Sequence, residues 1–143
     1  MKLNESRLEK QMKFLVEVDK FKDIIREIYT IHSARKENDA EHAWHMAAMA
    51  ILLSEHAPKG TDISKVIKMS LIHDLVEIYA GDVFAYDFKA DRKEKVLKEK
   101  RAAEKLFNIL PKDQAEELLG LWQEFGEQST KESKFAKALD KLQ

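Results

Sequence analysis

The chain contains no cysteine, and this absence narrows its chemistry. Without cysteine the protein cannot form disulfides, bind a metal through thiolates or use a cysteine nucleophile. It also lacks an excess of either charge, since 25 basic and 26 acidic residues give a formal net charge of -1. This balance argues against binding to a nucleic-acid polymer or a membrane surface, but it leaves room for a small phosphorylated ligand.

Long apolar runs are absent as well. No run approaches the roughly 20 residues that cross a bilayer. The amino terminus MKLNESRLEK is too polar for a secretory signal. We therefore expect a cytoplasmic protein, and 143 residues with 44% hydrophobic and 36% charged content are typical of one soluble domain over residues 1–143.

Glycine and proline are scarce, with four and two residues. Because almost no segment alternates with strand periodicity, the sequence predicts an all-α fold, a single compact bundle of about six helices. The expected helices cover about residues 5–28, 39–57, 62–77, 91–109, 112–126 and 130–143. A polar connection precedes the second helix, which Asn38 or Asp39 can cap. After the third helix, the segment GDVFAYDFKAD is predicted to be an active-site loop, because it is aromatic and acidic but not periodic.

His73 and Asp74 lie within the apolar stretch KVIKMSLIHDLVEIYAGD. Burying a neutral polar group costs about 2–7 kcal/mol unless it is compensated, and burying a charge costs more. A divalent metal would compensate both side chains, since it binds a neutral His nitrogen together with a carboxylate oxygen. His42 upstream and Asp140 downstream are further candidate ligands. Two His and two Asp would suit Mn, Co, Fe, Zn or Mg.

Glu77 follows His73 by one helical turn, so the two side chains are expected to share a helix face. If a metal polarises a phosphoryl group at this site, Glu77 is placed to pass a proton to the leaving oxygen. An HD dipeptide also occurs in ordinary helix cores, however, and we interpret His45 and His56 as ordinary helix residues. Only the combination of all candidate ligands with their flanking motifs favours a metal site.

That combination resembles the HD-domain phosphohydrolase superfamily, and more closely its branch of small 5′-deoxynucleotidase-like proteins. The resemblance covers about residues 14–143. It is carried by Arg35, ENDAEH at 37–42, IHDLVE at 72–77, Gly81-Asp82 and KALD at 137–140. It implies four metal ligands, namely His42, His73, Asp74 and Asp140.

The resemblance also implies roles for the flanking residues. Glu77 would transfer a proton, and Asp82 would help to position the attacking water or the sugar-phosphate. Arg35 would contact the phosphate through its planar guanidinium, and the weaker alternative is a solvated loop charge beside Lys36. Glu37 is expected to pair with Arg35 or to hold the loop.

The sequence departs from the family pattern upstream of the first ligand. Characterised deoxynucleotidases of this branch carry an Arg-Trp pair there, and the Trp is thought to exclude the ribose 2′-hydroxyl. In this chain the pair falls on Glu27-Ile28. Arg26, one residue away, is expected to take the arginine's part in substrate binding, but no Trp replaces the second residue. We interpret Trp44 as a packing residue, so selectivity for deoxyribose stays open.

The leading hypothesis is a metal-dependent phosphohydrolase that releases phosphate from (deoxy)nucleoside 5′-monophosphates. The alternative is a catalytically silent HD-fold protein that binds a nucleotide or acts as a scaffold. Glu77 and Asp82 favour the enzyme, because a pure scaffold has little use for two carboxylates beside a metal. A third hypothesis, a plain helical interaction module, leaves His73 and Asp74 without a partner.

The last predicted helix carries an apolar stripe formed by Phe135, Ala136, Leu139 and Leu142. The chain stops three residues after Asp140, whereas members of the resembled family usually continue with further helix, so we expect that the sequence is truncated or lacks a disordered tail. Because a small domain rarely exposes such a stripe, we expect a homodimer in which a second copy covers it.

Overall fold

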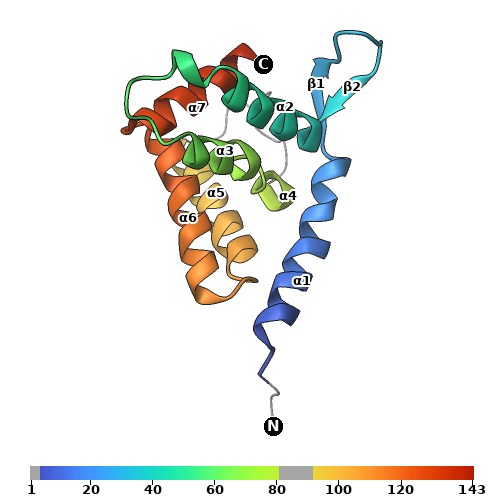
Figure 1. Cartoon of the computed structure of the whole chain (residues 1–143). Helices are drawn as coiled ribbons and strands as arrows, with labels where there is room; N and C mark the ends of the chain where they lie inside the picture. The colour runs from blue at the N-terminus through green and yellow to red at the C-terminus, as the bar shows by residue number, and fades with distance from the viewer. Residues whose placement is uncertain (1–3, 81–91) are drawn as a thin grey trace. The chain divides into compact units, whose positions relative to one another are not determined.

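The structure, a computed structural model, describes residues 4–80 and 92–143. Helices dominate these residues, which confirms the predicted all-α class (Figure 1). The elements are α1 (Arg7–Val18), η1 (Asp19–Asp23), β1 (Ile25–Tyr29), β2 (Lys36–Asn38), α2 (Asp39–Leu52), η2 (Ser54–His56), α3 (Ile63–Ile72), α4 (Glu77–Ala80), α5 (Arg92–Phe107), α6 (Lys112–Glu127) and α7 (Lys131–Leu142). None of the helices in the described ranges is long and apolar enough to cross a membrane.

The chain forms two compact units. The first comprises Met1–Phe21 and Leu75–Leu119, and the second comprises Lys22–Asp74 and Gly120–Gln143. In the first unit, the rings of Phe14 and Phe107 lie 6.4 Å apart between centroids. The second unit contains most of the residues that the sequence singles out for chemistry.

Polar side chains set the starts of the helices in the second unit. Asn38 accepts a hydrogen bond from the backbone N–H of Glu41, and the Glu41 carboxylate accepts one from the backbone of Asn38. This reciprocal capping box satisfies two donors that a helix start otherwise leaves unpaired. Asp62 caps α3 and Thr130 caps α7. The predicted helix starts near residues 39, 62 and 130 are therefore confirmed.

The predicted helix over residues 5–28 is wrong beyond Val18. After η1, residues Ile25–Tyr29 form β1, which pairs antiparallel with β2. Ile25 and Ile28 recur at helical spacing, yet they are 51% and 42% exposed. In this short β-branched and aromatic run, strand pairing outweighs helical spacing. The hairpin brings Arg26 toward Glu37, since Ile25 lies opposite Asn38 in the register.

The predicted helix over residues 62–77 is interrupted. α3 ends at Ile72 with His73 as its C-cap, and α4 starts only at Glu77. In the turns between them, Ile78 donates to the carbonyl of Leu75, a three-residue bond that replaces the α-helical pattern. His73 and Glu77 therefore do not share one continuous helix face, and that part of the sequence argument was wrong.

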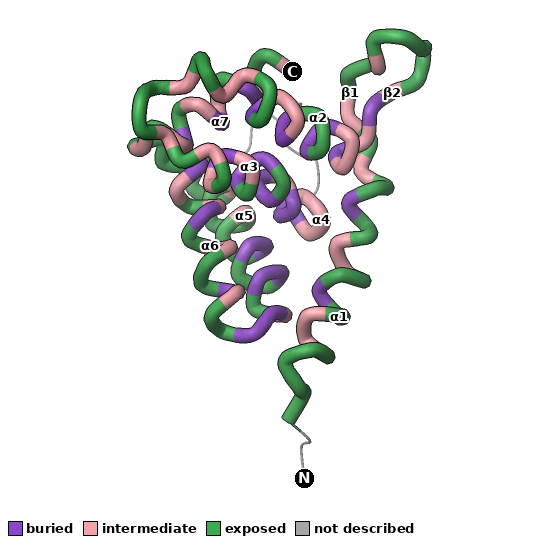
Figure 2. Tube along the Cα trace, viewed as in Figure 1, coloured by how far each residue is buried: buried purple, intermediate pink, exposed green. Residues whose placement is uncertain are grey.

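The core of the second unit lies between α2, α3 and α7, which pack on one another. All three helices carry fully buried positions (Figure 2). The apolar residues that are 0% exposed on these helices are Met46, Ala50, Val66, Met69 and Ala136. Alanines on α2 allow a close approach of the neighbouring helices. This packing fixes the positions from which the candidate ligands project.

Two of the four residues of the apolar stripe on α7 are buried. Ala136 is fully buried and Leu139 is 2% exposed, whereas Leu142 is 67% exposed. The argument for a dimer assumed that the whole stripe is uncovered, and this premise is wrong for the two buried residues. The dimer itself stays a prediction.

The two leucines of α7 should therefore contribute very differently to stability. We expect Leu139→Ala to lower the free energy of unfolding by about 2–5 kcal/mol, because it leaves a cavity in the core. Leu142→Ala should change it by no more than about 0.5 kcal/mol. Urea unfolding at two protein concentrations measures both effects. A large, concentration-dependent loss in Leu142→Ala would contradict its exposure and support the dimer.

Candidate metal centre

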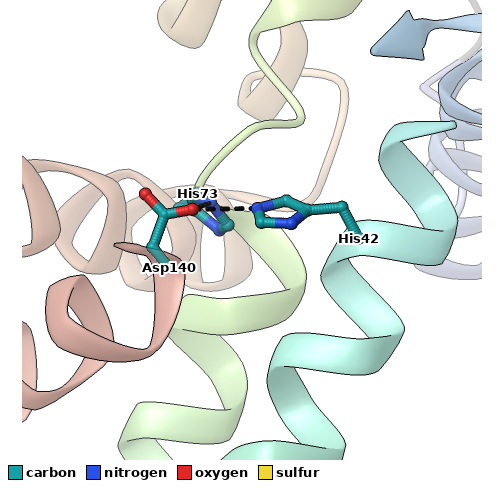
Figure 3. A group of neighbouring side chains, drawn as sticks. All are labelled: His42, His73 and Asp140. Carbon is teal, nitrogen blue, oxygen red and sulfur yellow. Dashed lines mark hydrogen bonds and ion pairs between the residues drawn. The ribbon is translucent and has the colours of Figure 1, made fainter. Parts of the chain in front are cut away.

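Three helices deliver His and Asp side chains to one point in the second unit. His42 lies on α2, His73 caps the end of α3, and Asp140 lies on α7 (Figure 3). One ligand atom from each of these side chains lies within 4.8 Å of the other two. His42 and His73 are buried, at 0% and 4% exposure. Three segments far apart in the sequence thus form one cluster.

Asp74 completes this cluster as a ring of four atoms. Asp140 Oδ1 lies 2.9 Å from His42 Nε2 and 3.7 Å from His73 Nε2. Asp74 Oδ2 lies 3.1 Å from His73 Nε2 and 3.7 Å from His42 Nε2. Ligands at about 2.1 Å from one ion are about 3.0–3.4 Å from their neighbours. The two shorter distances are close to this range and the two of 3.7 Å exceed it, so small side-chain shifts would bring the four atoms to the spacing of ligands around one divalent ion.

His73 supplies a further indication of a cation site. Its Nδ1 lies 3.0 Å from the backbone carbonyl of Ser70, which only accepts hydrogen bonds, so Nδ1 carries the proton. Its Nε2 is buried and has no hydrogen-bond partner among the described residues. In the neutral ring Nε2 directs a lone pair toward the oxygens of Asp74 and Asp140. A cation between them, either a proton or a metal, resolves this conflict.

The pKa values follow from the same arrangement. Burial alone would lower the pKa of His73, but the two neighbouring carboxylates outweigh it and raise that pKa to about 10. Burial would raise the pKa values of Asp74 and Asp140, but the adjacent imidazoles hold both below their ordinary range. The cluster therefore keeps two carboxylates ionised and retains a cation strongly.

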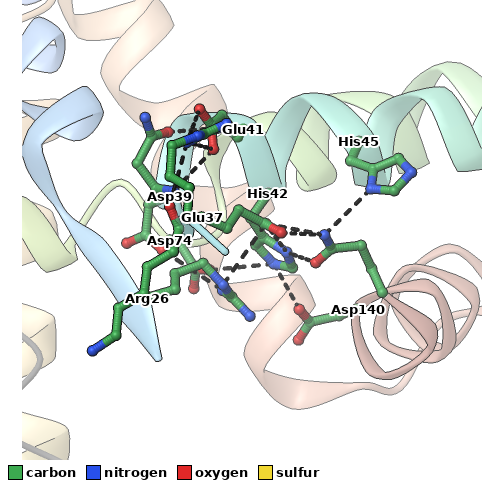
Figure 4. Close-up of polar contacts among 12 residues, drawn as sticks. Arg26, Glu37, Asp39, Glu41, His42, His45, Asp74 and Asp140 are labelled. Atoms are coloured by element: carbon green, nitrogen blue, oxygen red, sulfur yellow. Dashed lines mark hydrogen bonds and ion pairs between the residues drawn. The ribbon is translucent and has the colours of Figure 1, made fainter. Parts of the chain in front are cut away.

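His42 has a second set of partners on its other nitrogen. Its Nδ1 contacts Oε1 of Gln143, whose amide nitrogen lies 3.0 and 2.9 Å from the two carboxylate oxygens of Glu37. Glu37 is only 6% exposed. Glu37, His42 and His45 lie together on this side of the cluster (Figure 4). The sequence analysis did not identify Gln143, because a glutamine at the end of a charged helix carries no motif.

Arg26 lies beside the cluster, where the strand β1 holds it. Its Nη1 atom lies 3.6 Å from Asp39 Oδ1 and 3.8 Å from Asp74 Oδ2. Its Nε atom lies 3.9 Å from Glu37 Oε1. These distances are ion-pair contacts and exceed hydrogen-bond length. Nε makes no hydrogen bond to any residue in the described ranges. A guanidinium next to the cluster thus retains donor capacity.

Comparison with known proteins identifies the family of this chain. The HD domain family matches residues 18–143. The chain belongs to the HD domain family. This assignment agrees with the resemblance seen in the sequence and with the His and Asp residues that meet in the second unit.

Individual relatives of this HD domain are named as hydrolases. The 5′-deoxynucleotidase HDDC2 of Bos taurus is 33% identical over 92% of this chain and 63% of its own length. The protein of that name from Dictyostelium discoideum is 34% identical over 75% of this chain and 58% of its own length. A solved structure described as a predicted metal-dependent phosphohydrolase from Magnetospirillum magnetotacticum MS-1 is 50% identical, with a TM-score of 0.87, and covers 97% of this chain and 70% of its own. The chain thus spans less than two thirds of these two curated relatives.

Glu37 and Trp44 have other surroundings than the sequence suggested, and the phosphate contact predicted for Arg35 is not tested. Arg35, the predicted phosphate ligand, has a 59% exposed side chain and pairs with Glu41 at 2.8 Å. Its expected partner Glu37 instead accepts hydrogen bonds from Gln143. Trp44, interpreted as packing, is 67% exposed, which overturns that interpretation. Trp44 and Arg35 both line a pocket of about 580 Å³, together with Glu37.

The two predicted catalytic carboxylates are not tested by this geometry. Glu77 is the first residue of α4, in the first unit, whereas the His and Asp cluster lies in the second. Asp82 lies outside the described residues, as does the whole of the predicted active-site loop. Their roles stay predictions.

The raised pKa of His73 predicts how the metal-free HD domain responds to pH. Its folded-state pKa of about 10 exceeds the ordinary value of 6.5, so protonation of His73 favours the folded state. This stabilisation is fully present below pH 6.5 and is lost as the pH rises through about 10. We expect the melting temperature of chelator-treated protein to fall across that range, and to fall less in His73→Asn. Equal slopes in calorimetry would contradict the assignment.

Proposed function

We propose that this HD domain binds a divalent metal and hydrolyses the phosphate from (deoxy)nucleoside 5′-monophosphates. The proposed ligands are His42, His73, Asp74 and Asp140. The observation that carries the proposal is the ring of four ligand atoms, spaced 2.9–3.7 Å apart, with an unpaired imidazole nitrogen directed into it. No hydrophobic packing role accounts for two His and two Asp at this spacing.

The chemistry of the ligand set suits a hard or borderline ion. Two imidazole nitrogens and two carboxylate oxygens would accept Mn, Co, Fe, Zn or Mg. When bound, such an ion supplies Lewis acidity toward a phosphoryl group and lowers the pKa of water. The protein's own contribution would be to orient both imidazoles so that their Nε2 atoms could bind the ion. The Nδ1 atom of each ring contacts another group, which holds the ring in that orientation.

Arg26 is the proposed contact for the substrate phosphate. Its guanidinium is 3.8 Å from Asp74, so a phosphoryl group bound at the metal would lie within its reach. Its side chain is 20% exposed, and Nε still has a hydrogen bond to donate. A guanidinium fork matches the geometry of phosphate oxygens. Arg35 is a weaker candidate for the phosphate contact, because its Nη1 already donates to both carboxylate oxygens of Glu41.

Proton transfer and the positioning of the reactants are assigned to two carboxylates that are not metal ligands. We propose that Glu77 transfers a proton to the leaving oxygen and that Asp82 positions the attacking water or the sugar-phosphate. Both assignments rest on the HD-domain motif, in which Glu77 follows the HD pair by three residues. General acid–base catalysis requires a titratable group near the leaving oxygen.

The names of the relatives support a nucleotide as the substrate class. Those with about a third identity are named 5′-deoxynucleotidases. Selectivity between deoxyribose and ribose is not part of the proposal, because Ile28 occupies the position of the Trp that those enzymes are thought to use. The alternative function, a silent nucleotide-binding protein, differs in one measurable respect, since it binds metal and nucleotide but releases no phosphate.

Metal content should depend on the proposed ligands. We expect His73→Ala and Asp74→Ala to lose stoichiometric Mn or Co in elemental analysis, whereas His56→Ala, which changes an exposed histidine on η2, should retain it. Metal at 100 times its dissociation constant should stabilise the wild type by about 2.7 kcal/mol and leave the two ligand variants unchanged. Full occupancy in either ligand variant would refute the assignment.

Catalysis should separate from metal binding at Glu77. Glu77→Gln keeps the size of the side chain but removes the transferable proton, so we expect metal to be retained while turnover falls by about 10²–10⁴. Phosphate release from a panel of deoxy- and ribonucleoside monophosphates, after loading with Mn or Co, measures this effect. A rate near that of the wild type would assign Glu77 a structural role. Phosphate release from no nucleotide in the panel would favour the silent binding protein.

A further inference from the structure

Gln143 joins a buried carboxylate to a proposed metal ligand. Its amide nitrogen lies 3.0 and 2.9 Å from the oxygens of Glu37 and 3.3 Å from Nδ1 of His45. Its amide oxygen contacts Nδ1 of His42. The side chains of Glu37 and His42 are 8% and 0% exposed, so water has little access to either of them. One amide therefore connects Glu37 with the imidazole.

The direction of these hydrogen bonds follows from which groups can donate and which can only accept. An ionised carboxylate only accepts hydrogen bonds, so Glu37 requires the NH₂ end of the Gln143 amide. That orientation leaves the carbonyl end, which also only accepts, for His42. His42 must then donate from Nδ1, and its lone pair lies on Nε2. The reversed amide would direct an oxygen toward the Glu37 carboxylate.

We propose that Gln143, held by Glu37, is a positioning residue that fixes His42 in the tautomer required for metal binding. The inference rests on the proposed function, since it takes His42 as a ligand. Nε2 of His42 is the nitrogen that lies 2.9 Å from Asp140 and 3.7 Å from Asp74. Gln143 thus delivers a lone pair to the place where the two carboxylates need a cation.

The other imidazole of the cluster is held in the same way, by a different group. His73 donates from Nδ1 to the backbone carbonyl of Ser70. A backbone acceptor cannot be removed by substituting a side chain, whereas the acceptor of His42 can. Groups that orient a ligating histidine typically contribute 10–100-fold to metal affinity. The two histidines therefore have equivalent support, and only that of His42 is open to mutation.

The test compares Gln143→Leu with a pairwise exchange, Glu37→Gln combined with Gln143→Glu. Leucine has a similar size but offers His42 no acceptor. The exchange keeps the net charge and the pattern, because the new glutamine donates to the new glutamate, which accepts from Nδ1 of His42. Gln123→Leu, which changes an exposed glutamine on α6, is the matched control. The readout is the Mn²⁺ dissociation constant from competition with a chelator, and circular dichroism of the metal-free proteins checks folding.

We expect Gln143→Leu to weaken Mn²⁺ binding by about 10–100-fold, the control to leave it unchanged, and the exchange to restore most of the loss. Wild-type affinity in Gln143→Leu would overturn the inference, and so would an exchange variant as weak as Gln143→Leu. These two results would leave the metal site itself intact. A wild-type protein that binds no Mn²⁺ would instead overturn the proposed ligand set and this inference together.

Zinc-loaded protein gives a second readout that does not depend on affinity. In the wild type, the Nδ1–H of His42 should give a hydrogen-bonded ring N–H signal in proton–nitrogen NMR spectra. The signal should be lost or strongly shifted in Gln143→Leu and present in the exchange variant. A signal that is the same in all three proteins would show that another group holds the tautomer, and would overturn the role of Gln143.

Discussion

Two buried imidazoles whose Nε2 atoms face two partly buried carboxylates form the constraint on which the rest of this site depends. His42 and His73 present Nε2 to Asp74 and Asp140 at 2.9–3.7 Å. Without a cation, a lone pair on each Nε2 would face a carboxylate oxygen, and the buried imidazoles have little water to screen that repulsion. With one, the same distances become ligand spacings. The protein therefore retains a proton there when metal-free, as the raised pKa of His73 indicates, and proton and metal compete for one position.

The surrounding structure serves to hold this arrangement. α2, α3 and α7 pack through small and fully buried residues such as Ala50 and Ala136, which brings the three backbones close enough for short side chains to meet. The hairpin of β1 and β2 has a second role, because it carries Arg26 and Glu37 to the edge of the cluster. Glu37 then reaches His42 through Gln143. The two-stranded hairpin of this mostly helical protein thus takes part in the electrostatics of the site.

Much of this organisation could be predicted from the sequence, and the exceptions have physical causes. The helix starts near residues 39, 62 and 130 were predicted, because helix capping depends on the local sequence alone. The predicted helix over 5–28 was wrong past Val18, because Ile25 and Ile28 satisfy helical spacing while their environment favours a strand. Trp44 was read as packing, because an aromatic residue on a helix is usually buried. The role of Gln143 was not predicted, because its partners, Glu37 and His42, lie about a hundred residues away in the sequence.

The end of α3 shows why the break in that helix matters chemically. In a continuous α-helix, the carbonyl of Ser70 would accept a hydrogen bond from the backbone of residue 74. α3 instead stops at Ile72, and the last carbonyls of a helix have no partner within it. The carbonyl of Ser70 accepts from Nδ1 of His73, which directs Nε2 of the same ring to the two carboxylates. The carbonyl of Ser70 lies in the last turn of α3 and orients the His73 ring, so the end of α3 contributes to the geometry of the proposed cation site.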